Sequence, residues 1–435
     1  MEKLLKIAKE YADEVEVYSL KKSINSISYT NGKPKDMDFK IQSGVSLRII
    51  KDGKIGVSYT KNLKDRKRLV DNAVKSLKGG VEAKYSFPSD YNAEDLDTYD
   101  EEIEKISGRK LLKEAERFGE EIQISDDNEY MASLSASTNE IRIVNSNGLD
   151  VKTKNSSYVI FGGLIYPGTG TGLYRAFASK KFEQIPEKLV NEIKDYYRKS
   201  LNPVEPEGGK MKVLFMPVSS VTYLWRIMSG TSAKNIYENI SPLKGKIGEK
   251  IFSEKLTMVN DPLNNKYPGA RPFDDEGVKS RELKIIENGV LKNYFTNLDY
   301  ASKLGIEPTS TGYRSQMWGG DPITTNPSPS LKHISFENGD KTIEELIKSM
   351  DRGIIVEGAL GPHSGNIPNG DYSIGVNPGL YVENGKIKGI VKDAMVAGNI
   401  YDNFKNVLAV SKDNYFYNMG VIPGILCDNV SVSIK

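Results

Sequence analysis

Residues 271–305 read RPFDDEGVKSRELKIIENGVLKNYFTNLDYASKLG, and residues 369–399 read NGDYSIGVNPGLYVENGKIKGIVKDAMVAGN. Each segment has an Asn-Gly pair between two runs rich in β-branched and aromatic residues. Both residues of such a pair can adopt positive φ, which gives the tight turn that joins antiparallel strands. The pairs are Asn288-Gly289 and Asn384-Gly385, and the first half of the chain adds Asn31-Gly32, Asp52-Gly53 and Asn147-Gly148. We therefore expect antiparallel sheet in both halves.

Helices are indicated where apolar residues recur three and four positions apart. The clearest ranges are 2–12, 63–77, 108–122 and 186–201, and further candidates are 218–228, 298–304 and 342–350. Strands and helices occur in clusters rather than in strict alternation, which argues against a doubly wound parallel sheet. We expect an α+β fold with mixed, largely antiparallel sheets and flanking helices.

The length of 435 residues exceeds what one hydrophobic core of ordinary size holds, so we expect two domains. The segment 202–210, NPVEPEGGK, is rich in Pro, Gly and charge between a helix and a new strand, which is typical of a domain boundary. The prediction is an N-terminal α+β domain over residues 1–203 and a β-rich C-terminal domain over residues 210–435.

Charge is balanced along the chain. Sixty Lys and Arg stand against 58 Asp and Glu, and a net charge of +2 gives little generic attraction to nucleic acid or anionic membranes. We expect no direct nucleic-acid partner and no membrane partner. The first residues have an amphipathic helical pattern rather than that of a secretion signal, and the single cysteine, Cys427, excludes an internal disulfide. These features suit a reducing interior, so the expected localisation is cytoplasmic.

A peptidase zinc site needs two imidazoles on one helical face together with further ligands. The sequence has only two histidines, His333 and His363, thirty positions apart. His333 lies in an apparent strand, where a surface or partly packed side chain is the ordinary interpretation. His363 lies in the loop GALGPHSGN and is kept as a candidate cleft residue. We assign no metal ligand to this chain.

No motif for a nucleophile stands out. The Gly-rich segment 167–172 is interpreted as the tip of a hairpin, because it lacks the Gly-Lys-Ser/Thr ending of a phosphate loop. Ser241 and Lys244 have a Ser-x-x-Lys spacing that recurs by chance in a chain rich in both residues. Cys427 lies in a terminal strand pattern that suits a buried structural thiol. We assign no catalytic residue.

Loops on a rigid sheet often carry binding contacts. Two turn-rich loops, 274–277 and 361–372, are the candidates here, although acidic residues in such loops are commonly turn and cap residues. The residues predicted to face a peptide or a partner are Asp275, Glu276, Gly277, His363, Ser364, Asp371 and Tyr372.

The two segments quoted at the start resemble the C-terminal half of the TldD/PmbA family, whose other name is modulator of DNA gyrase. A Pro-Phe-Asp-x-Glu-Gly-Val element, an Asn-Gly hairpin, a helix ending in Lys-Leu-Gly, a Gly-Asp-Tyr-Ser turn and a Val-Glu-Asn-Gly hairpin follow one another as in that family. The resemblance is strong from about residue 210 to the end and looser over residues 1–200.

In that family, TldD-type members carry a His-Glu-x-x-x-His helix and a later cysteine that hold zinc, whereas PmbA-type members, also called TldE, lack them. The corresponding region here, 215–230, reads FMPVSSVTYLWRIMSG and has no histidine, aspartate or glutamate. The cysteine region resembles 418–424, NMGVIPG, which has no cysteine. The chain therefore resembles the metal-free PmbA/TldE type. The resemblance implies a heterodimer with a TldD-like subunit that holds the zinc, in which the pair encloses a cavity and cleaves short or unfolded peptides.

Two other interpretations stay open. The chain could be a homodimeric peptide- or protein-binding regulator of the gyrase-modulator type, without peptidase activity of its own. A regulator acting directly on nucleic acid is disfavoured by the near-neutral charge. No cofactor is expected in this chain under any of these interpretations.

Overall fold

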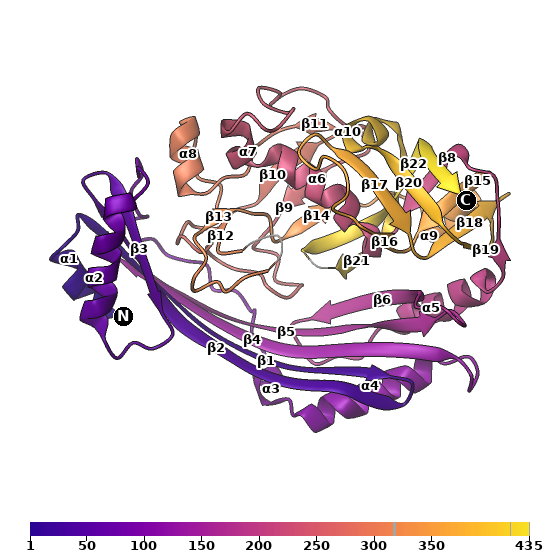
Figure 1. Cartoon of the computed structure of the whole chain (residues 1–435), viewed down its shortest axis with the longest axis horizontal. Coiled ribbons are helices and arrows are strands. Elements are labelled where there is room, and N and C mark those ends of the chain that lie inside the picture. Colours follow the sequence, from indigo (N-terminus) through magenta and orange to yellow (C-terminus); the bar gives the residue numbers. More distant parts are fainter. Residues whose placement is uncertain (316–318, 418, 435) are drawn as a thin grey trace.

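The computed structural model describes residues 1–315, 319–417 and 419–434 (Figure 1). Its N-terminal part is a six-stranded antiparallel sheet with the strand order β3-β2-β1-β4-β5-β6. The strands are β1 (Glu14–Thr30), β2 (Lys33–Lys51), β3 (Lys54–Thr60), β4 (Glu129–Asn145), β5 (Asp150–Ile165) and β6 (Gly172–Ser179). Four of them have 16 to 19 residues. At about 3.4 Å per residue each of these four is roughly 55–65 Å long, and together they form a long, curved sheet.

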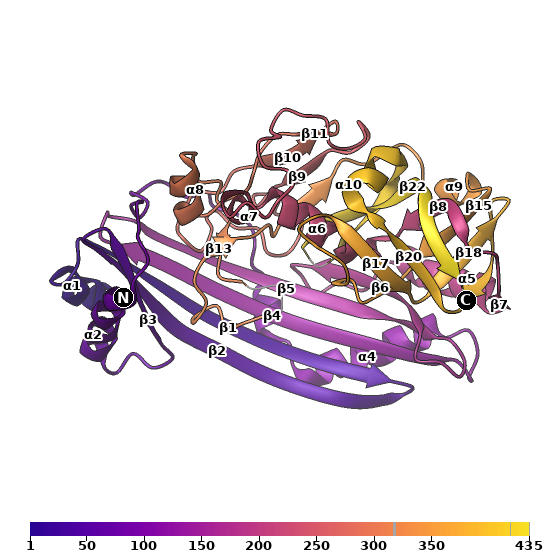
Figure 2. The same cartoon turned by 45° about the horizontal axis from the view of Figure 1, so that its top comes forward.

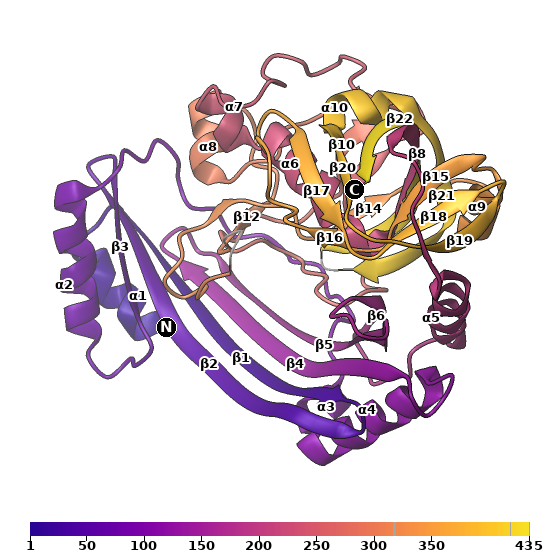
Figure 3. The ribbon, with the colours of Figure 1, turned by 45° about the vertical axis from the view of Figure 1, so that its right-hand side comes forward.

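Helices cover the sheet face that is turned away from the rest of the molecule (Figure 3). They are α1 (Glu2–Lys9), α2 (Arg66–Ser76), the 3-10 turn η1 (Leu77–Gly79), α3 (Glu101–Lys105) and α4 (Gly108–Ile122), and α5 (Glu187–Ser200) leads into the second half. Helix α4 begins after Ser107, whose hydroxyl accepts a hydrogen bond from the Lys110 amide at 3.2 Å. Its buried residues Leu111, Ala115, Phe118 and Ile122 recur at helical spacing, and the helix packs chiefly against strands β1 and β4.

The C-terminal lobe is built on a 14-stranded sheet, whose main path runs β11-β10-β9-β14-β22-β8-β15-β18-β19-β7, with β16, β17, β20 and β21 paired at its side. Three parallel pairings make this sheet mixed. Its strands are β7 (Pro203–Val204), β8 (Gly209–Phe215), β9 (Met258–Asn260), β10 (Leu283–Glu287), β11 (Val290–Leu291), β14 (Ile334–Phe336), β15 (Arg352–Val356), β16 (Ala359–Leu360), β17 (Asp371–Val376), β18 (Gly379–Glu383), β19 (Lys386–Val391), β20 (Ala394–Asn399), β21 (Val407–Tyr417) and β22 (Gly420–Ile434).

Short elements complete the lobe. A separate two-stranded sheet pairs β12 (Gly312–Tyr313) with β13 (Ser328–Pro329). The helices are α6 (Val221–Thr231), α7 (Ala233–Tyr237), α8 (Leu298–Leu304), α9 (Ile343–Lys348) and α10 (Ile400–Asn403), with 3-10 turns η2 (Pro217–Ser219) and η3 (Phe404–Asn406). Among the described residues, none of these or the N-terminal helices combines the length and apolar character that a membrane span requires.

The two halves share a hydrophobic core. Leu214, Ile347 and Leu380 of the C-terminal lobe belong to the same buried cluster as Phe118 and Tyr158 of the N-terminal part. The lobe therefore lies directly on the end of the sheet that carries β6 and α5 (Figure 2).

The expected α+β class with largely antiparallel sheets is confirmed. The five Asn-Gly and Asp-Gly pairs predicted as hairpin turns all join adjacent antiparallel strands. Both turn residues have positive φ in four of them, whereas at Asn147-Gly148 only Gly148 does, at 95°. The segment 167–172 is the tip between β5 and β6, as predicted.

The predicted helices are also present, with ends moved by capping. Helix α2 begins at Arg66 rather than at residue 63, because the Asp65 carboxylate accepts a hydrogen bond from the Arg68 amide at 2.9 Å. The range 218–228 starts as the 3-10 turn η2 and continues as α6 to Thr231. Helix α3, a single turn capped by Asp100, was not indicated by apolar spacing.

Candidate functional site

Helix α6 occupies the core of the C-terminal lobe (Figure 1). Tyr223, Leu224 and Ile227 are buried in the main apolar cluster of the lobe, and the Tyr223 ring lies 5.2 Å from the Phe404 ring. One charged residue, Arg226, is 0% exposed on the same helix. A charge this deep in an apolar core requires a full set of partners.

The Arg226 guanidinium donates hydrogen bonds to four backbone carbonyls. Its Nη1 contacts Thr222 O at 2.6 Å and Pro362 O at 2.8 Å, its Nη2 contacts Ser364 O at 2.7 Å, and its Nε contacts Asp371 O at 2.8 Å. The carbonyls of Pro362 and Ser364 belong to the loop that precedes β17, and that of Asp371 belongs to the first residue of the strand. Arg226 therefore fastens this loop, defined here as residues 361–371, to helix α6.

The chemistry of α6 does not fit a zinc ion. The helix contains no histidine, cysteine, aspartate or glutamate, which are the residues that bind zinc in proteins. Burial lowers the pKa of Arg226 to about 10, with Tyr372 and Asp371 opposing part of that shift, so the guanidinium is charged at neutral pH. A divalent cation about 5 Å away would be repelled by roughly 6–7 kcal/mol at an effective dielectric constant of about 20.

Four of the predicted peptide-facing residues lie on or beside loop 361–371. His363 and the Asp371 side chain are exposed, whereas Tyr372 is buried. The Asp371 carboxylate accepts a hydrogen bond from Asn399 Nδ2 at 2.9 Å, and the Tyr372 hydroxyl donates to Asn403 Oδ1 at 2.8 Å. The loop thus brings these residues together next to α6, and its exposed residues include His363, Asn366, Asn369 and Asp371.

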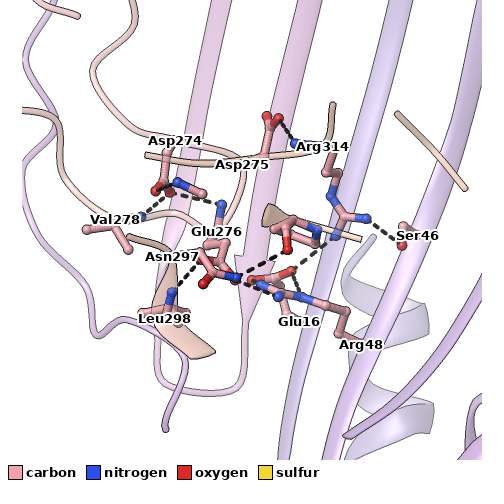
Figure 4. A network of polar contacts seen from close by, with 12 residues as sticks. Glu16, Ser46, Arg48, Asp274, Asp275, Glu276, Val278, Asn297, Leu298 and Arg314 are labelled. Carbon is pink, nitrogen blue, oxygen red and sulfur yellow. Dashed lines mark hydrogen bonds and ion pairs between the residues drawn. The ribbon is translucent and has the colours of Figure 1, made fainter. Parts of the chain in front are cut away.

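The other predicted loop, 274–277, lies at the junction of the lobe and the N-terminal sheet (Figure 4). Asp275 and Glu276 are 5% and 1% exposed. Glu276 Oε1 accepts a hydrogen bond from Arg48 Nη1 at 2.8 Å, and Arg48 pairs through two further nitrogens with Glu16 at 2.8 Å each. The structure therefore buries these carboxylates instead of presenting them on a surface loop, because arginines from the sheet neutralise them.

Asp275 is held by arginines in the same way. One of its oxygens accepts from Arg271 Nη2 at 2.8 Å and the other from the Arg314 amide at 2.8 Å. The Arg314 guanidinium reaches back to the sheet, with Nη1 3.0 Å from Ser46 Oγ. Gly277 has φ +75°, a backbone conformation that favours glycine, and a Cβ there would also press on the Leu149 side chain at 2.5 Å from Cδ2.

The pKa values of the acidic groups at this junction are shifted in different directions. Burial, followed by the neighbouring Glu276 charge, raises the pKa of Asp274 well above its usual value. Burial would also raise the pKa of Asp275, but Arg271 and hydrogen bonds from Arg314 outweigh it and lower that pKa. Burial raises the pKa of Glu276 against the attraction of Arg48. This paired set of buried charges fixes the lobe on the sheet.

The remaining candidate side chains are interior. His333 is partly buried just before β14 and its Nε2 is enclosed, so burial, with Arg271 and Lys332 adding to it, lowers its pKa to about 3. Cys427 lies in β22 and burial raises the pKa of its thiol. Within residues 1–315, 319–417 and 419–434, no group of three or more His, Cys, Asp and Glu side chains is arranged to hold a metal ion. Asn418, the first residue of the NMGVIPG segment, lies outside the described residues.

Two cavities adjoin the region where the lobe faces the sheet. One, of about 420 Å³, is lined by Asn155, Ser157, Val159, Phe161, Ala176, Ala178, Pro268, Gly269, Phe416 and Tyr417. The other, of about 590 Å³, lies between the 167–172 tip and strands β16, β17, β19 and β20. None of the seven predicted residues lines either cavity.

Sequence reasoning missed two features. The lobe-facing side of β4 carries Ser133, Ser135 and Ser137, which lie opposite Phe161, Val159 and Ser157 of β5. The alternation in SLSAS was a visible signal for a polar sheet face. The second missed feature was the role of Arg226, which the sequence indicated only as a single charge within the apolar stretch 213–228.

Two regions of the chain match models of known protein families. A family model described as the PmbA/TldA metallopeptidase C-terminal domain matches residues 208–434, and one for PmbA/TldA metallopeptidase domain 1 matches residues 15–77. Both matched regions of the chain thus correspond to domains of a metallopeptidase family. The chain belongs to the PmbA/TldD family, which confirms the resemblance found in the sequence.

Individual relatives and solved structures are similar to this chain over nearly its whole length. A Methanocaldococcus jannaschii protein described as uncharacterized is 27% identical over 416 residues, covering 94% of each chain. A Haemophilus influenzae protein named metalloprotease PmbA homolog is 25% identical over 420 residues, covering 91% of this chain and 88% of that one. TldE from Thermococcus kodakarensis has the same fold, with a TM-score of 0.89 over 100% of this chain and 99% of that one at 24% identity. A Thermotoga maritima protein described as a candidate modulator of a DNA gyrase superposes with a TM-score of 0.88 at 26% identity, covering 99% of each chain.

Proposed function

We propose that this chain is a non-catalytic PmbA/TldE-like subunit that completes the peptide chamber of a cytoplasmic TldD-type zinc peptidase. The observation that carries the proposal is the charge on α6, in the region where resemblance to TldD-type proteins would put the zinc ligands. Arg226 stands there with four carbonyl partners and no zinc ligand beside it on the helix. A TldD-like subunit would supply the zinc, which activates a water molecule in metallopeptidases.

The sheet face supports a role in peptide binding. Small side chains such as Ser135 and Ser157 leave room above the sheet, and the cavity of about 420 Å³ opens there. An extended peptide can lie along such a surface while its own backbone hydrogen bonds are made elsewhere in the chamber. The lobe restricts the space above this face, which favours short or unfolded peptides over folded proteins.

Zinc content and peptide hydrolysis test the assignment. The purified chain should hold substoichiometric zinc and should not hydrolyse peptides, whereas its mixture with a TldD-like chain should hydrolyse them until a chelator is added. Stoichiometric zinc in the isolated chain, with hydrolysis that a chelator stops, would refute the proposal.

A pair of variants tests the chamber wall. Ser157→Trp fills the cavity on the lobe-facing side of β5, so it should lower kcat/KM of the complex while leaving its assembly intact. Lys152→Trp is the matched control, because Lys152 is exposed on the opposite face of the same strand. Equal effects of both variants, or none from Ser157→Trp, would argue against peptide binding at this face.

A further inference from the structure

Strand β2 leaves a long stretch of sheet edge open. It pairs with β1 from residue 33 to residue 50, but β3 covers its other edge only from Val45 to Lys51. In the part of the chain that the structure describes, no strand pairs with that outer edge over residues 33–44. Figure 2 shows β2 at the margin of the sheet opposite β6. Native proteins usually shorten, cover or charge such an edge, because its free N–H and C=O groups can pair with another chain.

The side chains of this edge are unusually apolar for an exposed strand. Met37, Phe39 and Ile41 are 49%, 63% and 63% exposed, and they share one face because they alternate along the strand. Asp38 and Lys40 lie between them on the other face, where they form an ion pair within the strand. The sequence is therefore apolar, acidic, apolar, basic, apolar about Phe39.

We propose that residues 36–42 of β2 pair antiparallel with the same residues of a second copy of this chain, about a twofold axis at Phe39. In that register Asp38 lies opposite the partner's Lys40 and Met37 lies opposite the partner's Ile41, while the two Phe39 side chains meet at the axis. Each pairing occurs twice by symmetry. Opposite charges and apolar pairs directly across a strand pair both stabilise it.

Neighbouring registers are worse. An axis at Asp38 puts two carboxylates opposite each other, and an axis at Lys40 does the same with two ammonium groups. An axis at Met37 sets Asp36 against the partner's Asp38. An axis at Ile41 brings Val45, which β3 already covers, opposite the partner's Met37. Only the axis at Phe39 neutralises both charges, and this self-complementarity is the reason for choosing a second copy over an unrelated partner.

The paired edge would join two six-stranded sheets into one continuous sheet and bury the apolar row of both copies. The inference does not depend on the proposed peptidase role, since it concerns assembly of this chain with itself. It therefore fails or succeeds separately from the zinc and hydrolysis experiments.

Disulfide cross-linking tests the register directly. Phe39→Cys places two introduced thiols directly opposite each other, with Cβ atoms about 4.5–5.5 Å apart, which is within about 1 Å of disulfide geometry, so mild oxidation should give a covalent dimer. Cys427 is buried and does not compete. Ile41→Cys is the matched control, because its introduced thiols lie four residues apart along the strands, roughly 13 Å, and should not cross-link. A mixture of the Ile41→Cys and Met37→Cys chains should cross-link.

Charge exchange tests the same pairing in solution. The wild-type chain should sediment as a dimer, and Asp38→Lys should weaken the dimer about tenfold or more, because two repelling lysine pairs then replace two attractive pairs. Adding Lys40→Asp to Asp38→Lys restores complementary charges and should restore the dimer. A monomeric wild type, a dimer that ignores Asp38→Lys, no cross-link from Phe39→Cys, or pairing of this edge only with a TldD-like chain would each overturn the inference.

Discussion

Replacing Arg226 by methionine tests the central contact of the candidate site. The substitution keeps an unbranched apolar stem but removes the guanidinium group, and with it all four hydrogen bonds to the carbonyls of Thr222, Pro362, Ser364 and Asp371. Hydrogen bonds from a charged donor contribute about 1.5–3 kcal/mol each, and some of the loss is offset because the core no longer holds a buried charge and the loop carbonyls can regain water. We expect the free energy of unfolding to fall by about 3–5 kcal/mol.

The substitution should destabilise loop 361–371 locally as well as lower the free energy of unfolding of the whole chain. Hydrogen exchange of the amides in loop 361–371 should accelerate in Arg226→Met far more than that of the β4 amides, and urea denaturation gives the change in unfolding free energy. Arg281→Met is the matched control, because Arg281 is exposed and donates one hydrogen bond, to Pro308 O at 2.8 Å. If Arg226→Met costs no more than Arg281→Met, or if the exchange of loop 361–371 is unchanged, Arg226 does not anchor this loop.

Three further predictions follow from buried groups. Arg48→Met leaves two carboxylates at the junction without their partner and should cost about 3–5 kcal/mol in urea denaturation, whereas loss of the exposed Lys67–Asp71 pair in Lys67→Met should cost less than about 1 kcal/mol. Because the pKa of His333 is about 3 in the folded chain against its usual 6.5, the unfolded chain takes up the proton first as the pH falls, and stability is lost between these values. His333→Gln should remove about 2 kcal/mol of the loss between about pH 7 and pH 5, and an unchanged loss of stability over this range would contradict the burial of the imidazole. The Cys427 thiol should not react with a thiol reagent in the native chain and should react fully in denaturant; native reactivity would contradict its burial.

Local chemistry made much of the fold predictable. Turns such as Asn288-Gly289 follow from the positive φ that both residues accept, and helix α4 follows from a Ser107 cap and a regular apolar row. These signals act over a few residues, so they are readable without knowledge of distant contacts. Single-turn helix α3 was missed because five residues are too few to show a period.

The candidate site was less predictable, because the burial and pairing of its residues depend on partners that are distant in the sequence. Asp275 and Glu276 were predicted on local grounds to lie in a loop that faces a peptide or a partner, yet Glu276 is buried and pairs with Arg48, more than two hundred residues away in the sequence. Arg226 offered only a charge in an apolar stretch, and nothing nearby indicated that carbonyls from residues 362–371 would surround it.

The sequence by itself determined most helices and the five predicted hairpin turns, the family and the lack of zinc ligands on α6, since these depend on which residues are present and how they are spaced. The tertiary structure alone decided which charges are buried and paired, which face of the sheet is polar and open, and which edge of β2 has no neighbour. The physical reason is that burial, pairing and shifted pKa values arise from the distances between groups, and folding sets those distances between residues that the sequence keeps far apart.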